Sequence, residues 1–147
     1  MANLDDPIDP PEGWQREHLR RYVESDGADG HLWRNGTPTL LLTTVGRRSG
    51  KARRTPLIYS RDGDRYLVVA SKGGADDPPE WYLNLRQDPH VRLQVGPDVF
   101  DATAVTATPE EKARLWPVMT AVWPDYDGYQ TRTRREIPVV VLTPQPA

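Results

Sequence analysis

One short segment of the sequence has the residue types of an anion-binding turn. It runs from Gly46 to Arg54, as Gly-Arg-Arg-Ser-Gly-Lys-Ala-Arg-Arg, with five cations among nine residues and no acid. Its glycines allow a sharp turn that presents backbone N–H groups, and Arg forms forked hydrogen bonds with phosphates and carboxylates. It is not a Walker P-loop, because only three residues separate Gly46 from Gly50 and Ala52 replaces the magnesium-binding Ser or Thr. From composition alone, a polyanion clamp and a solvated charged hairpin are equally good interpretations.

A second segment, Ala70-Ser71-Lys72-Gly73-Gly74-Ala75, directly follows an expected strand. Ser71 can donate a hydrogen bond to a heterocycle, Lys72 adds a cation, and the glycines permit close approach of a flat or anionic ligand. The same residues also occur in ordinary loops, so the segment by itself is weak evidence. The adjacent Ser71 and Lys72 do not form the Ser-x-x-Lys nucleophile pattern.

Aromatic side chains are the third feature that could do chemistry. Six of them recur in the second half of the chain, namely Trp81, Tyr82, Trp116, Trp123, Tyr126 and Tyr129. Such rings can wall a planar ligand, and phenol hydroxyls can orient or protonate a substrate. We expect Trp116, in mid-helix, to pack in the core. Tyr126 and Tyr129 lie in a polar loop or short turn, where a pocket role is more plausible.

Composition excludes several classes of function. With 19 Lys and Arg against 21 Asp and Glu, the net charge of −2 excludes global attraction to nucleic acid or anionic membrane. Without cysteine there are no disulfides, thiolate nucleophiles or iron–sulfur clusters, so redox chemistry would need an organic cofactor. The three histidines, His18, His31 and His90, are isolated and lack metal-ligand spacing, so we predict no metal site.

The length of 147 residues favours one domain. Residues 1–13 are acidic and proline-rich and are expected to form a flexible N-terminal segment with nothing to bury, followed by a single domain over residues 14–147. This start does not resemble a signal peptide, and the apolar runs are too short to span a membrane. A soluble, cytoplasmic protein is therefore expected.

The periodicity of the chain predicts a mainly β fold with helices. Apolar spacing predicts a helix over residues 14–24, a short one over 80–86 and a third starting at Thr108, with a kink at Pro117. Strands are expected over residues 39–45, 55–60, 65–70, 91–95, 99–106 and 137–142. These elements favour a small antiparallel barrel with helices packed outside.

Taken together and in order, several motifs resemble the deazaflavin-dependent nitroreductase family. They are Leu41-Leu42-Thr43-Thr44-Val45 with the cationic turn and Thr55-Pro56-Leu57, then Val69-Ala70-Ser71-Lys72-Gly73-Gly74-Ala75, Trp81-Tyr82-Leu83-Asn84-Leu85, Trp123-Pro124-Asp125-Tyr126-Asp127-Gly128-Tyr129 and Ile137-Pro138-Val139-Val140-Val141. The match covers residues 39 to 143. It implies a split β-barrel, related to the FMN-binding barrels, of about six antiparallel strands with two to four flanking helices, and it implies coenzyme F420 as cofactor.

The resemblance also implies roles for particular residues. The cofactor would contact Arg47, Arg48, Arg53, Pro56, Ile58, Ala70, Ser71, Lys72, Gly73, Gly74, Ala75, Trp81, Asn84 and Tyr129. The substrate would contact Ile58, Glu80, Trp123 and Tyr126. Ser71, Tyr126 and Tyr129 would be catalytic, by polarising the ring or donating a proton. The reaction would be hydride transfer from reduced F420 to a quinone, an activated enone or a nitroaromatic compound.

Departures from the family pattern bear on the substrate. The nitroreductase branch has tyrosine where this chain has Ile58 and Trp123, and Glu80 stands where an apolar residue is usual, so efficient nitroimidazole reduction is not expected. Tyr59, beside Ile58, should face the other way.

Alternative functions and partners stay open. A noncatalytic F420 carrier and an FMN- or haem-binding split barrel are alternatives, although the clamp counts against the second. A nucleic-acid-binding barrel is disfavoured by the net charge of −2. The expected partner is a small hydride acceptor, with no nucleic acid, and the chain would be a monomer or homodimer. For the helix over residues 14–24 three roles stay open: it covers the pocket, it contacts a membrane peripherally without stable insertion, or it only packs on the fold.

Overall fold

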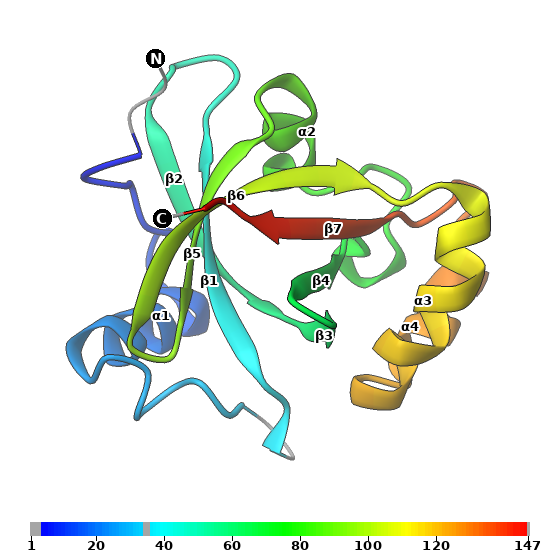
Figure 1. Cartoon of the computed structure of the whole chain (residues 1–147), viewed down its shortest axis with the longest axis horizontal. Coiled ribbons are helices and arrows are strands. Elements are labelled where there is room, and N and C mark those ends of the chain that lie inside the picture. Colours follow the sequence, from blue (N-terminus) through cyan, green and yellow to red (C-terminus); the bar gives the residue numbers. More distant parts are fainter. Residues whose placement is uncertain (1–3, 34–35, 147) are drawn as a thin grey trace.

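A curled antiparallel sheet forms the body of the protein (Figure 1). The structure, a computed structural model, describes residues 4–33 and 36–146. Over these residues the sheet has seven strands in the order β2-β1-β5-β6-β7-β4-β3. The strands are β1 Thr39–Val45, β2 Ala52–Ile58, β3 Ser60–Asp62, β4 Arg65–Val69, β5 His90–Val95, β6 Asp98–Thr106 and β7 Val139–Pro144. The short β3 is the strand that the sequence did not predict; it pairs with β4 across the turn at Gly63.

Four α-helices flank this sheet in the described part of the chain. They are α1 Trp14–Glu24, α2 Glu80–Gln87, α3 Pro109–Val122 and α4 Asp125–Thr131, with a short 3-10 turn, η2, at Lys72–Gly74. Figure 1 shows α1 at one end of the sheet and the pair α3 and α4 at the other. The expected helix over residues 14–24 agrees with α1, whereas the polar loop expected around Tyr126 is the helix α4.

The central strands are buried on both faces, which explains their continuous apolar runs. In β7, Val140 and Leu142 join the core cluster inside the curl, whereas Val139 and Val141 join a second cluster beneath α3. Successive side chains of a strand point to opposite faces, so an unbroken aliphatic run fits a strand covered on both sides. The sheet therefore serves two cores, and α3 packs on the outer one through Leu115 and Met119.

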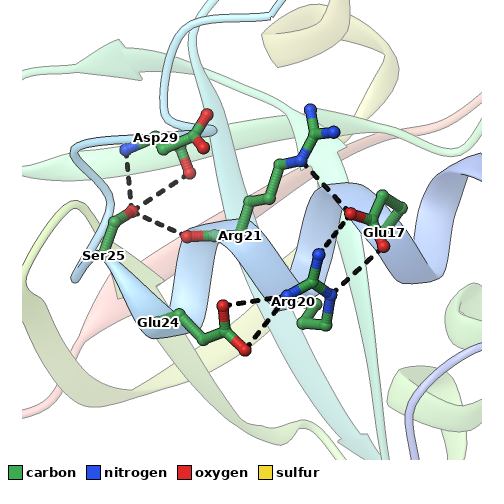
Figure 2. Close-up of polar contacts among 6 residues, drawn as sticks. All are labelled: Glu17, Arg20, Arg21, Glu24, Ser25 and Asp29. Atoms are coloured by element: carbon green, nitrogen blue, oxygen red, sulfur yellow. Dashed lines mark hydrogen bonds and ion pairs between the residues drawn. The ribbon is translucent and has the colours of Figure 1, made fainter.

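Helix α1 is fixed to the sheet by one buried face and carries ion pairs on its other side. Leu19 and Tyr22 pack against Leu41 of β1, and the Tyr22 hydroxyl donates to the Thr39 carbonyl at 3.0 Å. On the outer side, Arg20 lies between Glu17 and Glu24, and the Ser25 hydroxyl donates to the Arg21 carbonyl at the helix end (Figure 2). No helix of the described residues is long and apolar enough to cross a bilayer.

The segment before α1 packs on the sheet, and the expectation that it buries nothing is wrong. Leu4 is buried, Ile8 forms a β-bridge with Arg53, and Asp9 forms an ion pair with Arg54 at 2.9 Å. Acidic residues of this segment therefore have cationic partners on two strands. Asp9 pairs with Arg54 of β2, and Asp5 pairs with Arg92 of β5. The flexibility of this segment stays a prediction.

Helix α3 begins as the sequence predicts. Thr108 caps it by accepting from the Glu111 N–H while the Glu111 side chain accepts from the Thr108 N–H, a reciprocal capping box. The helix continues through Pro117, where a kink was expected. Trp116 packs against the outer core as predicted, and its indole N–H also donates to Asp127 of α4 at 2.7 Å.

Candidate functional site

The cationic segment forms the turn between β1 and β2 and lines a hollow. Hydrogen bonds from the Gly46 N–H to the Lys51 carbonyl and from the Gly50 N–H to the Gly46 carbonyl, both 2.8 Å, close the turn. The hollow has a volume of about 280 Å³ and is lined by Gly46, Arg47, Arg48, Ser49, Arg53, Glu80 and Asn84. We call these seven residues the clamp. All three arginines that the resemblance assigned to anion binding are brought together there.

The other two cations of the segment do not line the clamp. Lys51 is exposed, and Arg54 points to the other side of β2, where Asp9 holds it. This division follows from the alternation of side chains along a strand, which places Arg53 and Arg54 on opposite faces. The positive charge of the clamp therefore comes from two turn residues, Arg47 and Arg48, and from one strand residue, Arg53.

Asn84 positions Arg47. Its side chain is buried, and its Oδ1 accepts from both the backbone N–H of Arg47 at 3.2 Å and the Arg47 Nη1 at 2.9 Å. The Asn84 Nδ2 donates to Thr44 Oγ1 at 3.3 Å, which ties α2 to β1. Asn84, predicted to bind the cofactor, thus has its amide engaged by the protein and orients the first arginine of the clamp.

Glu80 lies in the clamp and not in the aromatic cavity where a substrate role would place it. Its Oε2 is 2.6 Å from the Arg47 Nη2, and the pKa of the Glu80 carboxyl is lowered first by this hydrogen bond and then by the charges of Arg47, Arg48 and Lys72. Glu80 is the acidic member of the seven clamp residues.

A larger cavity of about 320 Å³ begins where the clamp ends. Strand β2 contributes Arg53 to the clamp and Thr55 to Ile58 to the cavity, while α2 contributes Glu80 to the one and Trp81 to the other. The cavity is lined by Trp14, Gln15, His18, Trp33, Thr39, Thr55, Pro56, Leu57, Ile58, Val69, Ser71, Lys72, Gly73, Pro79, Trp81, Trp123, Tyr126 and Tyr129. Ile58 faces it, and Tyr59 points into the core, as expected.

Arg135 holds the segment that follows β4. Its guanidinium donates to three backbone carbonyls, those of Ala75 at 2.8 Å, Ser71 at 2.9 Å and Ala70 at 3.2 Å. Lys72 adopts a left-handed backbone conformation, with φ of 47°, which a side chain with a Cβ adopts only under constraint. Arg135 supplies that constraint and so fixes the position of Ser71 and Lys72 at the cavity.

The two adjacent glycines have different surroundings. Gly73 lines the cavity, and a Cβ there would meet nothing within 4 Å. Gly74 is buried against α4, where a Cβ would lie 2.6 Å from the Tyr129 carbonyl oxygen. Gly74, Ala70 and Ala75 are absent from the cavity wall, and the Ala70 side chain belongs to the inner core. The close approach that glycine permits at residue 74 is therefore to α4.

The connection between α3 and α4 forms one wall of the cavity, through the aromatic residues Trp123, Tyr126 and Tyr129. The Trp123 indole N–H donates to the Tyr129 hydroxyl at 3.3 Å. Tyr126 is 4% exposed, and burial raises the pKa of its phenol well above the usual value. A phenol in this state remains protonated at neutral pH and can donate a hydrogen bond.

A stack of three tryptophans lines this cavity, and it was not predicted from the sequence. Trp33 lies between Trp14 and Trp123, with ring centroids 5.4 Å and 5.5 Å away, and His18 of α1 lies 6.4 Å from Trp33. These residues come from α1, the segment after it and the end of α3. Their separation in sequence leaves no local signal, and Trp14 was expected only on the apolar face of the helix over residues 14–24.

Comparisons with known proteins agree with this geometry. The family model of the F420H(2)-dependent quinone reductases matches residues 14–144. An F420H(2)-dependent quinone reductase of Mycobacterium tuberculosis is 45% identical over 131 residues, covering 87% of this chain and 88% of that protein. A second such protein of the same species, described as putative, is 42% identical over 116 residues, covering 79% of this chain and 98% of that one.

Solved structures give the same result for the fold. A chain described as a domain-swapped dimer superposes with a TM-score of 0.70 at 39% identity, covering 86% of this chain and 95% of that one. An F420-H2 dependent reductase superposes with a TM-score of 0.67 at 40% identity, covering 71% and 93%. The predicted mainly β split barrel and the predicted family resemblance are thereby confirmed. The chain belongs to the F420H(2)-dependent quinone reductase family.

Proposed function

We propose that this protein catalyses hydride transfer from reduced F420 to a quinone. It is an oxidoreductase by family, and the observation that carries the specific reaction is that neighbouring residues of β2 and of the start of α2 line the clamp and the aromatic cavity. A ligand with an anionic tail and a flat ring needs a cationic site for the tail and, next to it, an aromatic cavity for the ring.

The residues present fit F420. Arg47, Arg48 and Arg53 would hold its phosphate and acidic tail, since Arg forms forked hydrogen bonds to such anions. Ser71, Lys72 and Gly73 would approach the ring, with Pro56 and Ile58 of β2 and Trp81 of α2 forming apolar walls. Asn84 and Arg135 would act by positioning, because both have their polar atoms engaged with the protein.

When bound, reduced F420 would supply the hydride, and with it the two electrons that a quinone needs. The proton that completes the hydroquinone then comes from a side chain or from water. Tyr129 and Tyr126 line the cavity and would meet the oxygen of the acceptor. Because burial raises the pKa of Tyr126, this residue suits hydrogen-bond donation and loses its proton reluctantly.

The tryptophan stack would exclude water and receive the acceptor ring. Trp33 stacks on both Trp14 and Trp123, with centroids 5.4 and 5.5 Å apart, inside the range of about 4.5 to 7 Å that aromatic pairs prefer, so the three rings form a continuous apolar wall. Quinones have flat rings that match this wall. The proposal also includes activated enones and nitroaromatic compounds as hydride acceptors. The cavity supports them less than quinones, because none of its lining residues is specific for a nitro group.

The test is to mix purified protein, reduced F420 and menadione without oxygen, and to follow the absorbance of oxidised F420. Multiple turnovers that require the protein support the proposal. Saturable binding of F420 without turnover of any quinone would replace it with the noncatalytic carrier. Saturable binding of FMN in place of F420 would favour the other alternative, a flavin-binding barrel.

We also propose that the protein is a homodimer. The support is the solved relative described as a domain-swapped dimer, which this chain resembles over 86% of its length. Light scattering after size exclusion would give a mass of about twice 16.7 kDa for a dimer. A mass equal to that of one chain would show that the protein is a monomer and that the homodimer proposal is wrong.

A further inference from the structure

We propose that Glu80 is an internal counter-anion of the clamp, which an anionic ligand displaces from Arg47 and which returns when that ligand leaves. The inference rests on the proposed function and deepens it, by assigning to one residue the control of cofactor affinity and release. It concerns a residue that touches the binding site, and it is independent of the chemistry in the aromatic cavity.

The geometry shows which partner is fixed and which is free to move. The Arg47 side chain is 19% exposed and is anchored through Nη1 to Asn84, whereas the Glu80 side chain is 70% exposed. The ion pair is made by the other terminal nitrogen, Arg47 Nη2, at 2.6 Å from Glu80 Oε2. Arg47 would therefore stay in place for a ligand, while Glu80 can swing into solvent.

The charges show why an anion settles at this position. Arg47, Arg48 and Lys72 all act on the Glu80 carboxyl and lower its pKa, so the carboxylate lies where three cations converge. The other clamp residues supply a third arginine, Arg53, and no second acid. A phosphate entering the clamp meets the same cations and competes with Glu80 for the same nitrogen.

The competition is mild because the pair is exposed to solvent. Exposed ion pairs contribute little, in the range of about one- to fivefold in an equilibrium constant. Glu80 would thus lower the affinity for an anionic ligand without preventing its binding. Such tuning suits a cofactor that is oxidised in every turnover and must be exchanged or reduced again, and its effect should appear in the dissociation rate.

The experiment compares Glu80→Gln and Glu80→Ala with the wild-type protein and with Glu110→Gln. The control changes the net charge equally, and Glu110 is exposed in the first turn of α3, outside the clamp and the cavity. Binding of F420 is measured by fluorescence titration, and its release is measured by stopped flow. The second ligand is the deazaflavin nucleoside that lacks the phosphate and the glutamate tail.

We expect both Glu80 variants to bind F420 about two- to fivefold more tightly, with most of the change in the dissociation rate. Affinity for the nucleoside should not change in any variant, and Glu110→Gln should behave as wild type. Weaker binding of F420 by Glu80→Gln would overturn the inference and make Glu80 a residue that orients Arg47. Equal changes in Glu80→Gln and Glu110→Gln would also overturn it, because net charge would then explain the effect.

The two proposals fail in different ways. If the wild-type protein does not bind F420 saturably, both the proposed function and the role of Glu80 are wrong. If it binds F420 and the Glu80 variants bind no more tightly, only the role of Glu80 is wrong. Thermal melting of each variant checks that the fold is retained, and little change is expected at so exposed a side chain.

Discussion

Tyr126 shows how burial decides what a residue at the site can do. Its phenol lines the cavity from α4 and is almost inaccessible to solvent. Burial disfavours the phenolate and raises the pKa of Tyr126, so the hydroxyl remains a donor at neutral and mildly alkaline pH. Such a hydroxyl can stabilise, by a hydrogen bond, the negative charge that develops on an acceptor oxygen. Because its pKa is raised, it is less suited than an ordinary tyrosine to give up its proton.

For Tyr126→Phe we therefore expect kcat for quinone reduction to fall about three- to tenfold, the value of one hydrogen bond. The affinity for F420 should stay within twofold. A fall of more than a hundredfold would contradict this and would make Tyr126 the proton donor. The wild-type rate should show no loss from ionisation of Tyr126 as the pH rises to 10, because its raised pKa keeps it neutral.

Some of these residue roles could be predicted from the sequence and others could not. The spacing of the cations predicted one turn, and the resemblance singled out Arg47, Arg48 and Arg53, which the structure brings together around one hollow. Trp33 and Arg135 were missed because their partners lie far away in the chain, and neither segment has a periodic pattern. Glu80 was recognised as unusual, but only the structure shows that Arg47 pairs with it.

At the scale of elements, the segment between β4 and α2 depends on contacts from the segment before β7. Arg135 lies there, and its three hydrogen bonds reach back to residues 70–75. Short, irregular segments such as η2 have few backbone hydrogen bonds of their own, so a charged donor from outside has a large effect on their order.

We expect Arg135→Ala to lower the free energy of unfolding by about 2 kcal/mol, the value of hydrogen bonds from a charged donor. Amide exchange of residues 72–75 should accelerate, and kcat should fall while the clamp still binds F420. Arg134→Ala is the control, because Arg134 is exposed on the same stretch and should change stability by less than about 0.5 kcal/mol. Unchanged exchange in the Arg135 variant would remove this residue from the positioning of Ser71.

The packing of η2 on α4 gives a second element-scale prediction. Gly74→Ala would place a Cβ 2.6 Å from the Tyr129 carbonyl oxygen at a residue with φ of 86°. We expect a loss of about 2 to 4 kcal/mol in urea unfolding, from overpacking added to backbone strain. Gly73→Ala has the strain without the clash, so its loss should be about 1 kcal/mol. Equal losses would mean that α4 can move away without cost.

The elements themselves followed from sequence wherever the signal was local. The helix of residues 14–24 and the capping box at Thr108 were correctly predicted, because amphipathic spacing and cap residues act within one or two turns. Strand β3 has three residues, too few for a period-two pattern. Helix α4 contains Asp125, Asp127 and Gly128, which favour turns, and its tertiary contacts with η2 and α3 override that preference.

At the scale of the whole molecule, charge is separated into small, opposite regions. The net charge is −2, yet the clamp gathers three arginines and one acid within a hollow of about 280 Å³. Away from the clamp, two acidic residues of the N-terminal segment are paired with cations of the sheet: Asp9 with Arg54 of β2, and Asp5 with Arg92 of β5. Attraction of a polyanion is therefore short-ranged. Cytoplasmic location and a peripheral membrane contact stay predictions.

We accordingly expect F420 binding to weaken about tenfold between 0.05 and 0.5 M NaCl, as the screening length shortens to a few ångströms. The affinity of the deazaflavin nucleoside, which lacks the anionic tail, should change much less between the two salt concentrations. Equal salt sensitivity of the two ligands would mean that salt acts on the fold, and insensitivity of both would contradict a role for the clamp in binding.

Strand β7 lies between β6 and β4, so among the described residues the hairpin of β3 and β4 joins the rest of the sheet only through the last of the seven strands. During synthesis on the ribosome, Leu67 and Val69 emerge some seventy residues before the aliphatic run that will cover their hydrogen-bonding edge. The nascent chain must keep this apolar hairpin soluble until β7 has been made. A chain that stops before Val139 would leave two open sheet edges at once, and should be a substrate for chaperones and proteases instead of a smaller, folded barrel.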